Sequence, residues 1–252
     1  MNNNNLATFS PFMGQGKRDA DMKLNHGTTA VGFVYQGGIV LCADSKVTQG
    51  NVILSKSMLK ALPVGDHIMA TVAGASADCS FWIRTLAWES RLHELKYGEP
   101  LSLLAAATII SNVSLDEWDN GRNLYMGMIL AGMDESGPGL VRINCDGFIV
   151  RGTLFAVGSG SERALEILNT GFDFDLSDQQ AFDLGFRAVC HASIEDAYTG
   201  GSVSLHHMVK NTWKTLGTKT CKELHENFKK GLNYAGEGED EELLPPKRLK
   251  LV

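Results

Sequence analysis

Near the start of its patterned region, the chain carries short segments in which apolar residues alternate with polar ones or run together. Residues 29–35 and 38–44 form two such segments, and the Gln-Gly-Gly sequence between them is typical of a tight turn between antiparallel strands. In the second segment both alternating sets of positions are mostly apolar, as expected for a strand covered on both faces. A third strand is predicted over 67–73. These patterns indicate a sheet that lies between two other layers.

A helical period replaces this alternation after residue 80. The apolar stripe of the first predicted helix consists of Phe81, Thr85, Trp88, Leu92 and Leu95. A second helix is predicted over 101–118. A third begins at Ser177, where Gln180 completes a capping-box pattern, and it ends near Tyr198. Apolar residues occupy two faces of this third helix, which indicates that it packs between layers.

Further strands are predicted over 125–133, 140–145, 154–157 and 202–209. The order along the chain is therefore strands, two helices, strands, a helix and strands. Two stacked sheets with helices outside would explain why strands are apolar on both faces. We predict an α+β chain that forms a four-layer α/β/β/α sandwich of two mostly antiparallel sheets.

Two segments without periodicity flank this core. Residues 1 to about 25 are rich in Asn, Gly and Lys, as is typical of a flexible leader. Residues 235–252 contain an acidic run followed by a Pro-Pro-Lys-Arg-Leu-Lys sequence, which is typical of a charged tail. The composition between them is uniform and contains no linker. The core is therefore predicted to be one domain.

Composition and charge argue against several functional classes. The 252 residues are 44% hydrophobic and 21% charged, as in globular proteins, and no apolar run is long enough to span a membrane. The net charge of −6 argues against nucleic-acid binding. The five cysteines form no C-x-x-C pair, and the first residues do not resemble a secretory signal. We expect a protein of a reducing compartment, with no metal, cofactor, nucleic-acid or membrane partner.

Other candidate motifs are weak. The glycine-rich segment 158–161 precedes a helix, but its spacing does not fit a phosphate-binding loop, so a tight strand-to-helix turn is the better interpretation. His206 and His207 are adjacent on a predicted strand and point to opposite faces, so they are not expected to bind one metal together. The usual metallopeptidase and serine-hydrolase signatures do not occur.

The Gly27–Thr28 bond lies where the leader meets the first predicted strand. Taken alone, a Gly-Thr pair is common at the start of a strand. If the leader is removed at this bond, however, Thr28 carries both a hydroxyl nucleophile and a free α-amine. The pKa of an α-amine is about 7.7–8, so this amine can act as a base near neutral pH. Activation of a threonine by its own terminal amine is a known form of nucleophilic catalysis.

Three further residues have types that this chemistry needs. Asp44 ends the strand that is paired with the strand of Thr28. Lys60 enters an apolar segment, so it is either a surface residue or a buried cation paired with Asp44. A positive charge beside Thr28 would lower the pKa of both its hydroxyl and its amine. Gly74 ends another strand, where a backbone N–H is free to face a developing oxyanion.

Together these segments resemble the β subunits of proteasomes, members of the N-terminal nucleophile hydrolase superfamily, over about residues 26–228. The match is to the chymotrypsin-like beta type-5 subunits in particular. The segments that carry the resemblance are 26–29, 35–38, 77–82, 137–140, 157–161 and 196–201. The resemblance implies the fold of that superfamily. It also implies a propeptide over 1–27, a catalytic domain over 28–234 and a charged tail over 235–252.

The resemblance also implies a role for each matching residue. Thr28 would be the nucleophile, and Lys60, held by Asp44, would tune its pKa. The Gly74 N–H would be the oxyanion donor. The groups that hydrogen-bond the terminal amine and the nucleophile would be Ser159, Asp196 and Thr199, the last in place of the family's Ser. The residues that contact substrate would be Val47, Thr48, Met58, Val72 and Ser76, with the peptide added as a strand between the segments of Thr48 and Gly74.

The function implied by the resemblance is that of a threonine endopeptidase matured by its own cleavage of Gly27–Thr28. Its partners would be other α and β subunits in a stacked four-ring particle and, indirectly, a regulatory particle. The substrates would be unfolded polypeptides cut after hydrophobic residues, in ubiquitin-dependent degradation in the cytoplasm and nucleus. Two alternatives remain: a non-catalytic ring subunit of the same fold, and a small-molecule amidase of the same superfamily. The complete set of site residues argues against the first.

Overall fold

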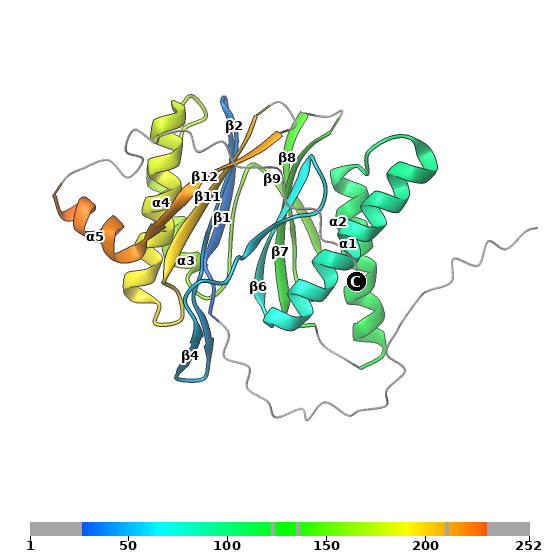
Figure 1. Cartoon of the computed structure of the whole chain (residues 1–252), viewed down its shortest axis with the longest axis horizontal. Helices are drawn as coiled ribbons and strands as arrows, with labels where there is room; N and C mark the ends of the chain where they lie inside the picture. The colour runs from blue at the N-terminus through cyan, green and yellow to red at the C-terminus, as the bar shows by residue number, and fades with distance from the viewer. Residues whose placement is uncertain (1–26, 122–123, 135–136, 210–211, 231–252) are drawn as a thin grey trace, which may run out of the picture.

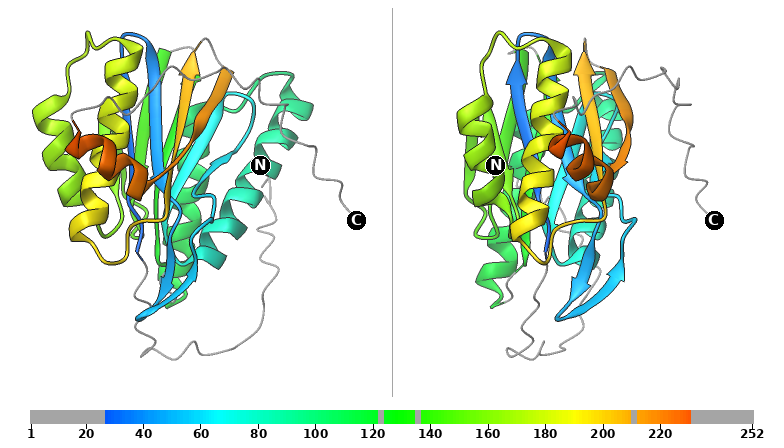
Figure 2. Two further views of the ribbon diagram at one scale, coloured as in Figure 1. Left: turned by 60° about the vertical axis from the view of Figure 1, so that its left-hand side comes forward. Right: turned by 90° about the vertical axis from the view of Figure 1, so that its left-hand side faces the viewer.

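The computed structural model describes residues 27–121, 124–134, 137–209 and 212–230. The predicted leader, apart from Gly27, and the predicted tail lie outside the described residues. Two five-stranded sheets stack face to face, and helices cover the outer side of each (Figures 1 and 2). All pairs of neighbouring strands are antiparallel. The predicted four-layer α/β/β/α sandwich is therefore confirmed.

The first sheet carries the start of the domain. Its strands, in spatial order, are β10 (Leu154–Val157), β1 (Ala30–Tyr35), β2 (Gly38–Asp44), β11 (Ser202–Val209) and β12 (Thr212–Thr220). The helices on its outer side are α3 (Ser161–Gly171), α4 (Asp178–Glu195) and α5 (Cys221–Lys229). The β1–β2 hairpin thus lies between β10 and β11, two strands from the second half of the chain.

The second sheet and its helices come from the middle of the chain. Its strands, in spatial order, are β5 (Ala61–Pro63), β6 (Ile68–Gly74), β7 (Met126–Asp134), β8 (Gly137–Ile143) and β9 (Ile149–Gly152). Its outer face is covered by α1 (Ser76–Tyr97) and α2 (Leu103–Asp119). No helix in the described part of the chain is both long and apolar enough to cross a membrane.

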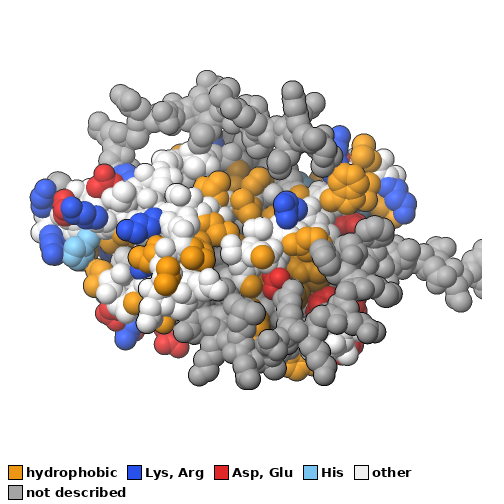
Figure 3. Space-filling model, turned by 60° about the horizontal axis from the view of Figure 1, so that its bottom comes forward, with side chains coloured by type: hydrophobic (Ala, Val, Ile, Leu, Met, Phe, Trp, Pro, Cys, Tyr) orange, Lys and Arg blue, Asp and Glu red, His pale blue; other side chains and the backbone are white. Residues whose placement is uncertain are grey.

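A short hairpin projects from one end of the sandwich, where β1 begins (Figure 1). It consists of β3 (Val47–Gln49) and β4 (Val52–Ser55), and the side chains of Val52, Ile53 and Leu54 are exposed. Figure 3 looks onto this end, and apolar side chains gather across the middle of the face. The sequence pattern did not predict this hairpin, because its apolar residues do not face a core.

A layer of apolar side chains fills the space between the sheets. Leu41 of β2 and Ile129 of β7 are fully buried in it. A second layer lies between the first sheet and α4, and a third between the second sheet and α1 with α2. Strand β2 therefore has apolar layers on both faces, as its sequence predicted.

Helix α1 differs from the prediction in its start and in its buried face. It begins at Ser76, five residues before the predicted stripe, and the residues that face the core are Cys79, Ile83, Leu86 and Ser90. Trp88, Leu92 and Leu95 of the predicted stripe are exposed instead. The apolar period correctly indicated a helix, but this helix has two apolar faces and only one contacts the sheet. Strand β12 and helix α5 were also not predicted.

Candidate active site

Thr28 lies directly before β1 and is only 4% exposed. Its hydroxyl donates a hydrogen bond to the carbonyl oxygen of Gly27 at 2.7 Å, and its N–H donates to Ser159 Oγ at 3.3 Å. Strand β1 pairs with β10, and Ser159 follows the end of β10, so the sheet itself places Ser159 beside the start of β1. The hydroxyl of Thr28 thus lies next to the carbonyl of the bond that was predicted to be cut.

The side chain of Lys60 reaches the same carbonyl from another segment. Its Nζ donates to the Gly27 oxygen at 3.1 Å and to Asp44 Oδ1 at 2.7 Å. Lys60 and Asp44 are both buried. Of the two interpretations of Lys60, the structure therefore shows a buried cation paired with Asp44. The Lys60 ammonium lies within hydrogen-bonding distance of the Gly27 oxygen.

The carboxylate of Asp44 is held at the end of β2 by backbone groups as well. The Thr29 N–H donates to Oδ1 at 3.0 Å. The N–H groups of Gly200 and Lys46 donate to Oδ2 at 3.0 and 3.1 Å. Both oxygens are therefore fixed, and the carboxylate holds the lysine against Gly27.

Burial and charge act against each other in this pair. Burial lowers the pKa of the Lys60 ammonium below its ordinary value, and the neighbouring Asp44 carboxylate opposes this shift. Burial also raises the pKa of the Asp44 carboxyl. Lys60 and the N–H groups of Thr29 and Gly200 oppose this rise. Each group thus opposes the shift that burial imposes on the pKa of the other.

A second polar network holds the amide nitrogen of Thr28. The hydroxyls of Ser159 and Thr199 both donate to Asp196 Oδ2, at 2.5 and 2.6 Å. The Thr199 hydroxyl is also hydrogen-bonded to Thr29 Oγ1 at 2.7 Å. The loop after α4 and the turn after β10 are therefore connected to each other and to the start of β1.

Glycines let the turn after β10 approach β1. A Cβ atom on Gly158, whose φ is +100°, would lie 2.0 Å from the carbonyl oxygen of Thr28. A Cβ atom on Gly160 would lie 2.2 Å from Thr29 Oγ1. Because α3 begins at Ser161, the segment is the strand-to-helix turn that the sequence favoured, and it packs against Thr28.

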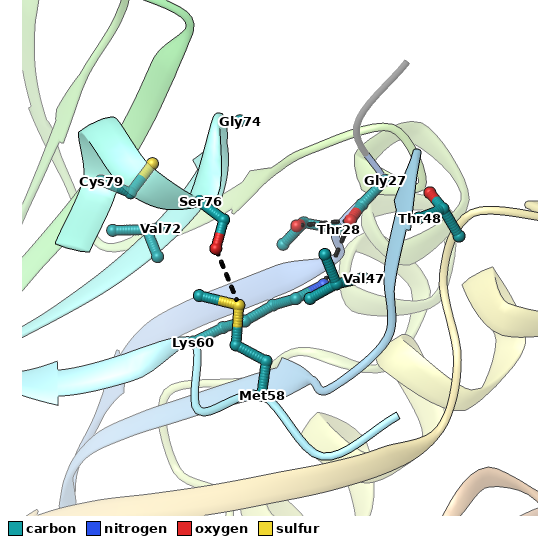
Figure 4. A pocket seen from close by; sticks show the side chains of 10 residues that line it. All are labelled: Gly27, Thr28, Val47, Thr48, Met58, Lys60, Val72, Gly74, Ser76 and Cys79. Carbon is teal, nitrogen blue, oxygen red and sulfur yellow. Dashed lines mark hydrogen bonds between the residues drawn. The ribbon is translucent and has the colours of Figure 1, made fainter. Parts of the chain in front are cut away.

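A cavity opens beside Thr28 (Figure 4). The residues that line it are Gly27, Thr28, Val47, Thr48, Met58, Lys60, Val72, Gly74, Ser76 and Cys79. They include all five of the residues predicted to contact substrate. Cys79 was not predicted to line it, although Cys79 lies three residues after Ser76 and therefore on the same side of α1.

Gly74 lies at the end of β6 and lines the same cavity. Its φ of +125° is a conformation that favours glycine, and a Cβ atom there would lie 1.9 Å from the carbonyl oxygen of Tyr125. The structure therefore brings Gly74, Lys60 and Thr28 to one cavity, although they come from three separate segments.

The described residues contain no group of three His, Cys, Asp or Glu side chains that is arranged to hold a metal ion. His206 and His207 lie on opposite faces of β11, as their adjacency predicted. His206 Nδ1 is hydrogen-bonded to Thr215 Oγ1, whereas His207 Nε2 is hydrogen-bonded to the Tyr35 hydroxyl, each at 2.9 Å.

Comparison with known proteins identifies the family. The family model described as "Proteasome subunit" matches residues 24–208. "Proteasome subunit beta type-5" of Dictyostelium discoideum is 40% identical over 207 residues, which cover 82% of this chain and 75% of the relative. "Probable proteasome subunit beta type-5" of Schizosaccharomyces pombe is 43% identical over 192 residues, with 76% and 70% covered. "Proteasome subunit beta type-8" of Homo sapiens is 34% identical over 219 residues, with 86% and 79% covered. This chain therefore belongs to the proteasome subunit family and has its N-terminal nucleophile hydrolase fold.

Proposed function

We propose that the chain is a catalytic β subunit of a 20S proteasome, a threonine endopeptidase that cuts its own Gly27–Thr28 bond. One observation carries the proposal: the Thr28 hydroxyl and the Lys60 ammonium both lie within hydrogen-bonding distance of the Gly27 carbonyl oxygen. Such an arrangement places a nucleophile and a positive charge at one peptide bond. The proposed boundaries are a propeptide over 1–27, a catalytic domain over 28–234 and a tail over 235–252.

The first reaction is maturation. The Thr28 hydroxyl attacks the Gly27 carbonyl carbon, with a water molecule as the base because an amide nitrogen is a poor proton acceptor. Lys60 stabilises the negative charge that develops on the carbonyl oxygen. The C–N bond then breaks, the Thr28 nitrogen takes up a proton, and Gly27 is held as an ester. Water hydrolyses this ester and leaves Thr28 with a free amine and a free hydroxyl.

The second reaction is cleavage of substrate. The freed amine takes the proton of the Thr28 hydroxyl, which attacks the substrate carbonyl. Ser159, with Asp196 and Thr199 behind it, orients the amine. Lys60 favours the deprotonated nucleophile, and the Gly74 N–H stabilises the oxyanion. The C–N bond of the substrate then breaks, and the proton held by the Thr28 amine passes to the leaving amine. Water hydrolyses the acyl-enzyme that results: the Thr28 amine takes a proton from the attacking water and delivers it to the Thr28 hydroxyl oxygen.

The substrate in this proposal is an extended polypeptide. It adds as a strand between the segments of Thr48 and Gly74, a common mode of peptide recognition. The residue before the cut enters the cavity lined by Val47, Met58 and Val72, which favours a hydrophobic side chain. The chain works with other α and β subunits in a four-ring particle that degrades ubiquitin-tagged proteins in the cytoplasm and nucleus.

Intact mass and peptide cleavage test this proposal together. The native chain should begin at Thr28 and should cut a peptide with an apolar residue before the bond. Thr28→Ala should retain residues 1–27 and be inactive, whereas Thr28→Ser, which keeps a hydroxyl, should be processed. A native chain that retains its leader and cuts no peptide would instead be a non-catalytic subunit. A processed chain that splits small amides but no peptide would be an amidase.

A further inference from the structure

Thr29 lies between the two polar networks that meet at Thr28. It follows Thr28 directly in the chain and is fully buried. Its N–H donates to Asp44 Oδ1 at 3.0 Å, and its hydroxyl is hydrogen-bonded to Thr199 Oγ1 at 2.7 Å. The first contact reaches the buried ion pair, and the second reaches the network of hydroxyl groups. Thr29 therefore contacts both networks, although the proposed reaction gives its side chain no role.

The direction of the second hydrogen bond follows from the number of hydroxyl protons. An ionised carboxylate only accepts hydrogen bonds, and a hydroxyl group carries a single proton. The Thr199 hydroxyl donates its proton to Asp196 Oδ2 at 2.6 Å. The proton between Thr29 and Thr199 must therefore come from Thr29. Donation thus runs from Thr29 through Thr199 to Asp196, and the Ser159 hydroxyl donates to the same carboxylate oxygen.

The turn after β10 packs closely against both threonine hydroxyls. Thr199 is 2% exposed, and a Cβ atom on Gly160 would lie 2.2 Å from Thr29 Oγ1 and 3.1 Å from Thr199 Oγ1. The space between the turn and these hydroxyls is therefore too small for a water molecule. If the Thr29 hydroxyl is removed, the Thr199 oxygen loses its donor, and no solvent on this side replaces it.

The hydroxyl of Thr29 can be removed while the ion pair stays intact, because Thr29 contacts Asp44 through its backbone. Its N–H donates to the Asp44 carboxylate, and its carbonyl oxygen accepts from the Asp44 N–H at 3.0 Å. Valine has the same backbone groups and is branched at Cβ as threonine is. Thr29→Val therefore removes the hydroxyl and keeps both contacts with Asp44.

We propose that Thr29 is a positioning residue for the cleavage of substrate, an inference that rests on the proposed function. Its hydroxyl holds the Thr199 hydroxyl in the direction of Asp196. The Ser159 hydroxyl, which donates to the same carboxylate, then stays in place to orient the Thr28 amine. Loss of the Thr29 hydroxyl therefore slows proton transfer by the amine and leaves the binding of substrate unchanged.

Peptide cleavage by the full chain, recovered in its assembly, tests this role. Thr29→Val should lower kcat about three- to tenfold and leave KM within about twofold, because the lost contact serves the reaction rather than substrate binding. Thr29→Ser, which keeps the hydroxyl, should recover most of the lost kcat. The inference is wrong if Thr29→Val cuts as fast as the unmodified chain, or if Thr29→Ser is as slow as Thr29→Val.

The acceptor of the hydrogen bond gives a second test. Thr199→Val removes both the acceptor for Thr29 and the donor to Asp196. Thr29→Val added to Thr199→Val should lower kcat no further, because the two hydroxyls act through one contact. An equal loss in both backgrounds would mean that Thr29 acts by another route, which would contradict the inference.

Thr71→Val is the matched control. Thr71 is also a fully buried threonine, and its neighbours across the sheet, Ala61 and Ile129, belong to the layer between the sheets. Within the described part of the chain, its Oγ1 has no hydrogen-bond partner. The same substitution there should leave kcat and KM unchanged. A loss of kcat as large as that of Thr29→Val would show a general response to buried valine and would overturn the inference.

The unmodified chain separates this inference from the proposed function. If it begins at Thr28 and cuts the peptide, the proposed function holds, and the kcat values of the Thr29 variants alone decide the positioning role. If it retains its leader and cuts no peptide, the proposed function fails and the positioning role fails with it. Should Thr29→Val not assemble, Thr29→Ala takes its place with the same expected loss, because its smaller side chain cannot crowd its neighbours.

Discussion

At the scale of single residues, the centre of the site is a pair of opposite charges buried together. Lys60 donates to Asp44 at 2.7 Å, and both side chains are almost inaccessible to solvent. Such pairs contribute little net stability, because desolvation offsets their attraction, but removal of one partner leaves an unpaired charge in the interior. The pair is therefore explained better by the position it gives to Lys60 than by stability.

This view predicts how single and double substitutions differ. Asp44→Asn should lower the free energy of unfolding by about 3–5 kcal/mol, because the buried ammonium loses its partner. Asp44→Asn combined with Lys60→Met should recover much of this loss, although both forms should be inactive. Chemical denaturation of the purified variants measures the difference. A double variant no more stable than Asp44→Asn would argue against a buried pair.

A second residue-scale prediction concerns acid. Burial lowers the pKa of His206 to about 4 in the folded chain, against about 6.5 in the unfolded chain. Between these values the unfolded chain binds a proton that the folded chain does not. Stability should therefore fall as the pH drops from about 6.5 to 4, by at most about 3 kcal/mol. Unfolding measured across this range should show a shallower loss in His206→Gln, and an identical loss in both proteins would disprove the assignment.

At the scale of elements, the ends of strands matter more than their middles, because Asp44 and Gly74 end β2 and β6 and Ser159 follows β10. Gly74 shows the constraint most clearly. Its left-handed backbone lets β6 turn toward α1 beside the carbonyl of Tyr125. Gly98, at the end of α1, has a φ of +77° but open space around it. Both glycines therefore have a backbone conformation that favours glycine, but only Gly74 also lies too close to another segment for a Cβ atom.

Alanine at these two positions should have different costs. Gly98→Ala should destabilise the fold by about 1 kcal/mol, the cost of a left-handed alanine. Gly74→Ala should cost about 2–5 kcal/mol, because its Cβ atom also collides with backbone. Denaturation of the two variants side by side tests the comparison. Equal costs would mean that β6 and β7 separate readily at this end.

At the scale of the whole molecule, apolar side chains occur both in enclosed layers and on an exposed outer face of α1. The layer between the sheets is enclosed, and Leu41 lies in it with no exposed surface. The outer face of α1 carries Leu95, which is 68% exposed. The same residue type therefore occurs in the core and on an outer surface of this chain.

Truncation of these two leucines should distinguish the enclosed layer from the exposed face. Leu41→Ala should lower the free energy of unfolding by about 2–5 kcal/mol, because it leaves a cavity between the sheets. Leu95→Ala should change it by no more than about 0.5 kcal/mol. Urea unfolding of the isolated chain is the measurement. A large effect at Leu95 would show that the outer face of α1 is covered in the folded chain.

Much of this architecture can be predicted from the sequence, and the elements that were predicted wrongly or not at all have physical reasons for it. Strand β2 is predictable because its two apolar faces leave no other interpretation, and α4 because its capping box marks its start. The buried face of α1 is not predictable, because apolar residues occur on both of its sides. The β3–β4 hairpin carries its apolar residues toward solvent, so the usual pattern is missing.

Some features of the candidate site can likewise be predicted from the sequence, and others cannot. The chemistry at Gly27–Thr28, the possible pairing of Lys60 with Asp44 and the free N–H predicted for Gly74 follow from residue types and positions. The remaining assignments rest on resemblance to a family. The hydrogen bond between Thr29 and Thr199 follows from neither. It depends on the relative position of the start of β1 and the loop after α4, which only the folded chain determines.

The pairing of β1 with β2 places Ala30 opposite Ala43, and the next residue, Asp44, then reaches Lys60 and the Thr29 N–H. A slip of one residue in this hairpin would turn each side chain of β2 to the other face of the sheet. Asp44 would then point away from Lys60, which would be left without a counterion. A chain with a mispaired hairpin would thus be less stable and would also lack the Lys60–Asp44 pair of the candidate site. The position of this one carboxylate therefore depends on the correct register of the hairpin, and both the stability of the fold and the proposed chemistry depend on that position.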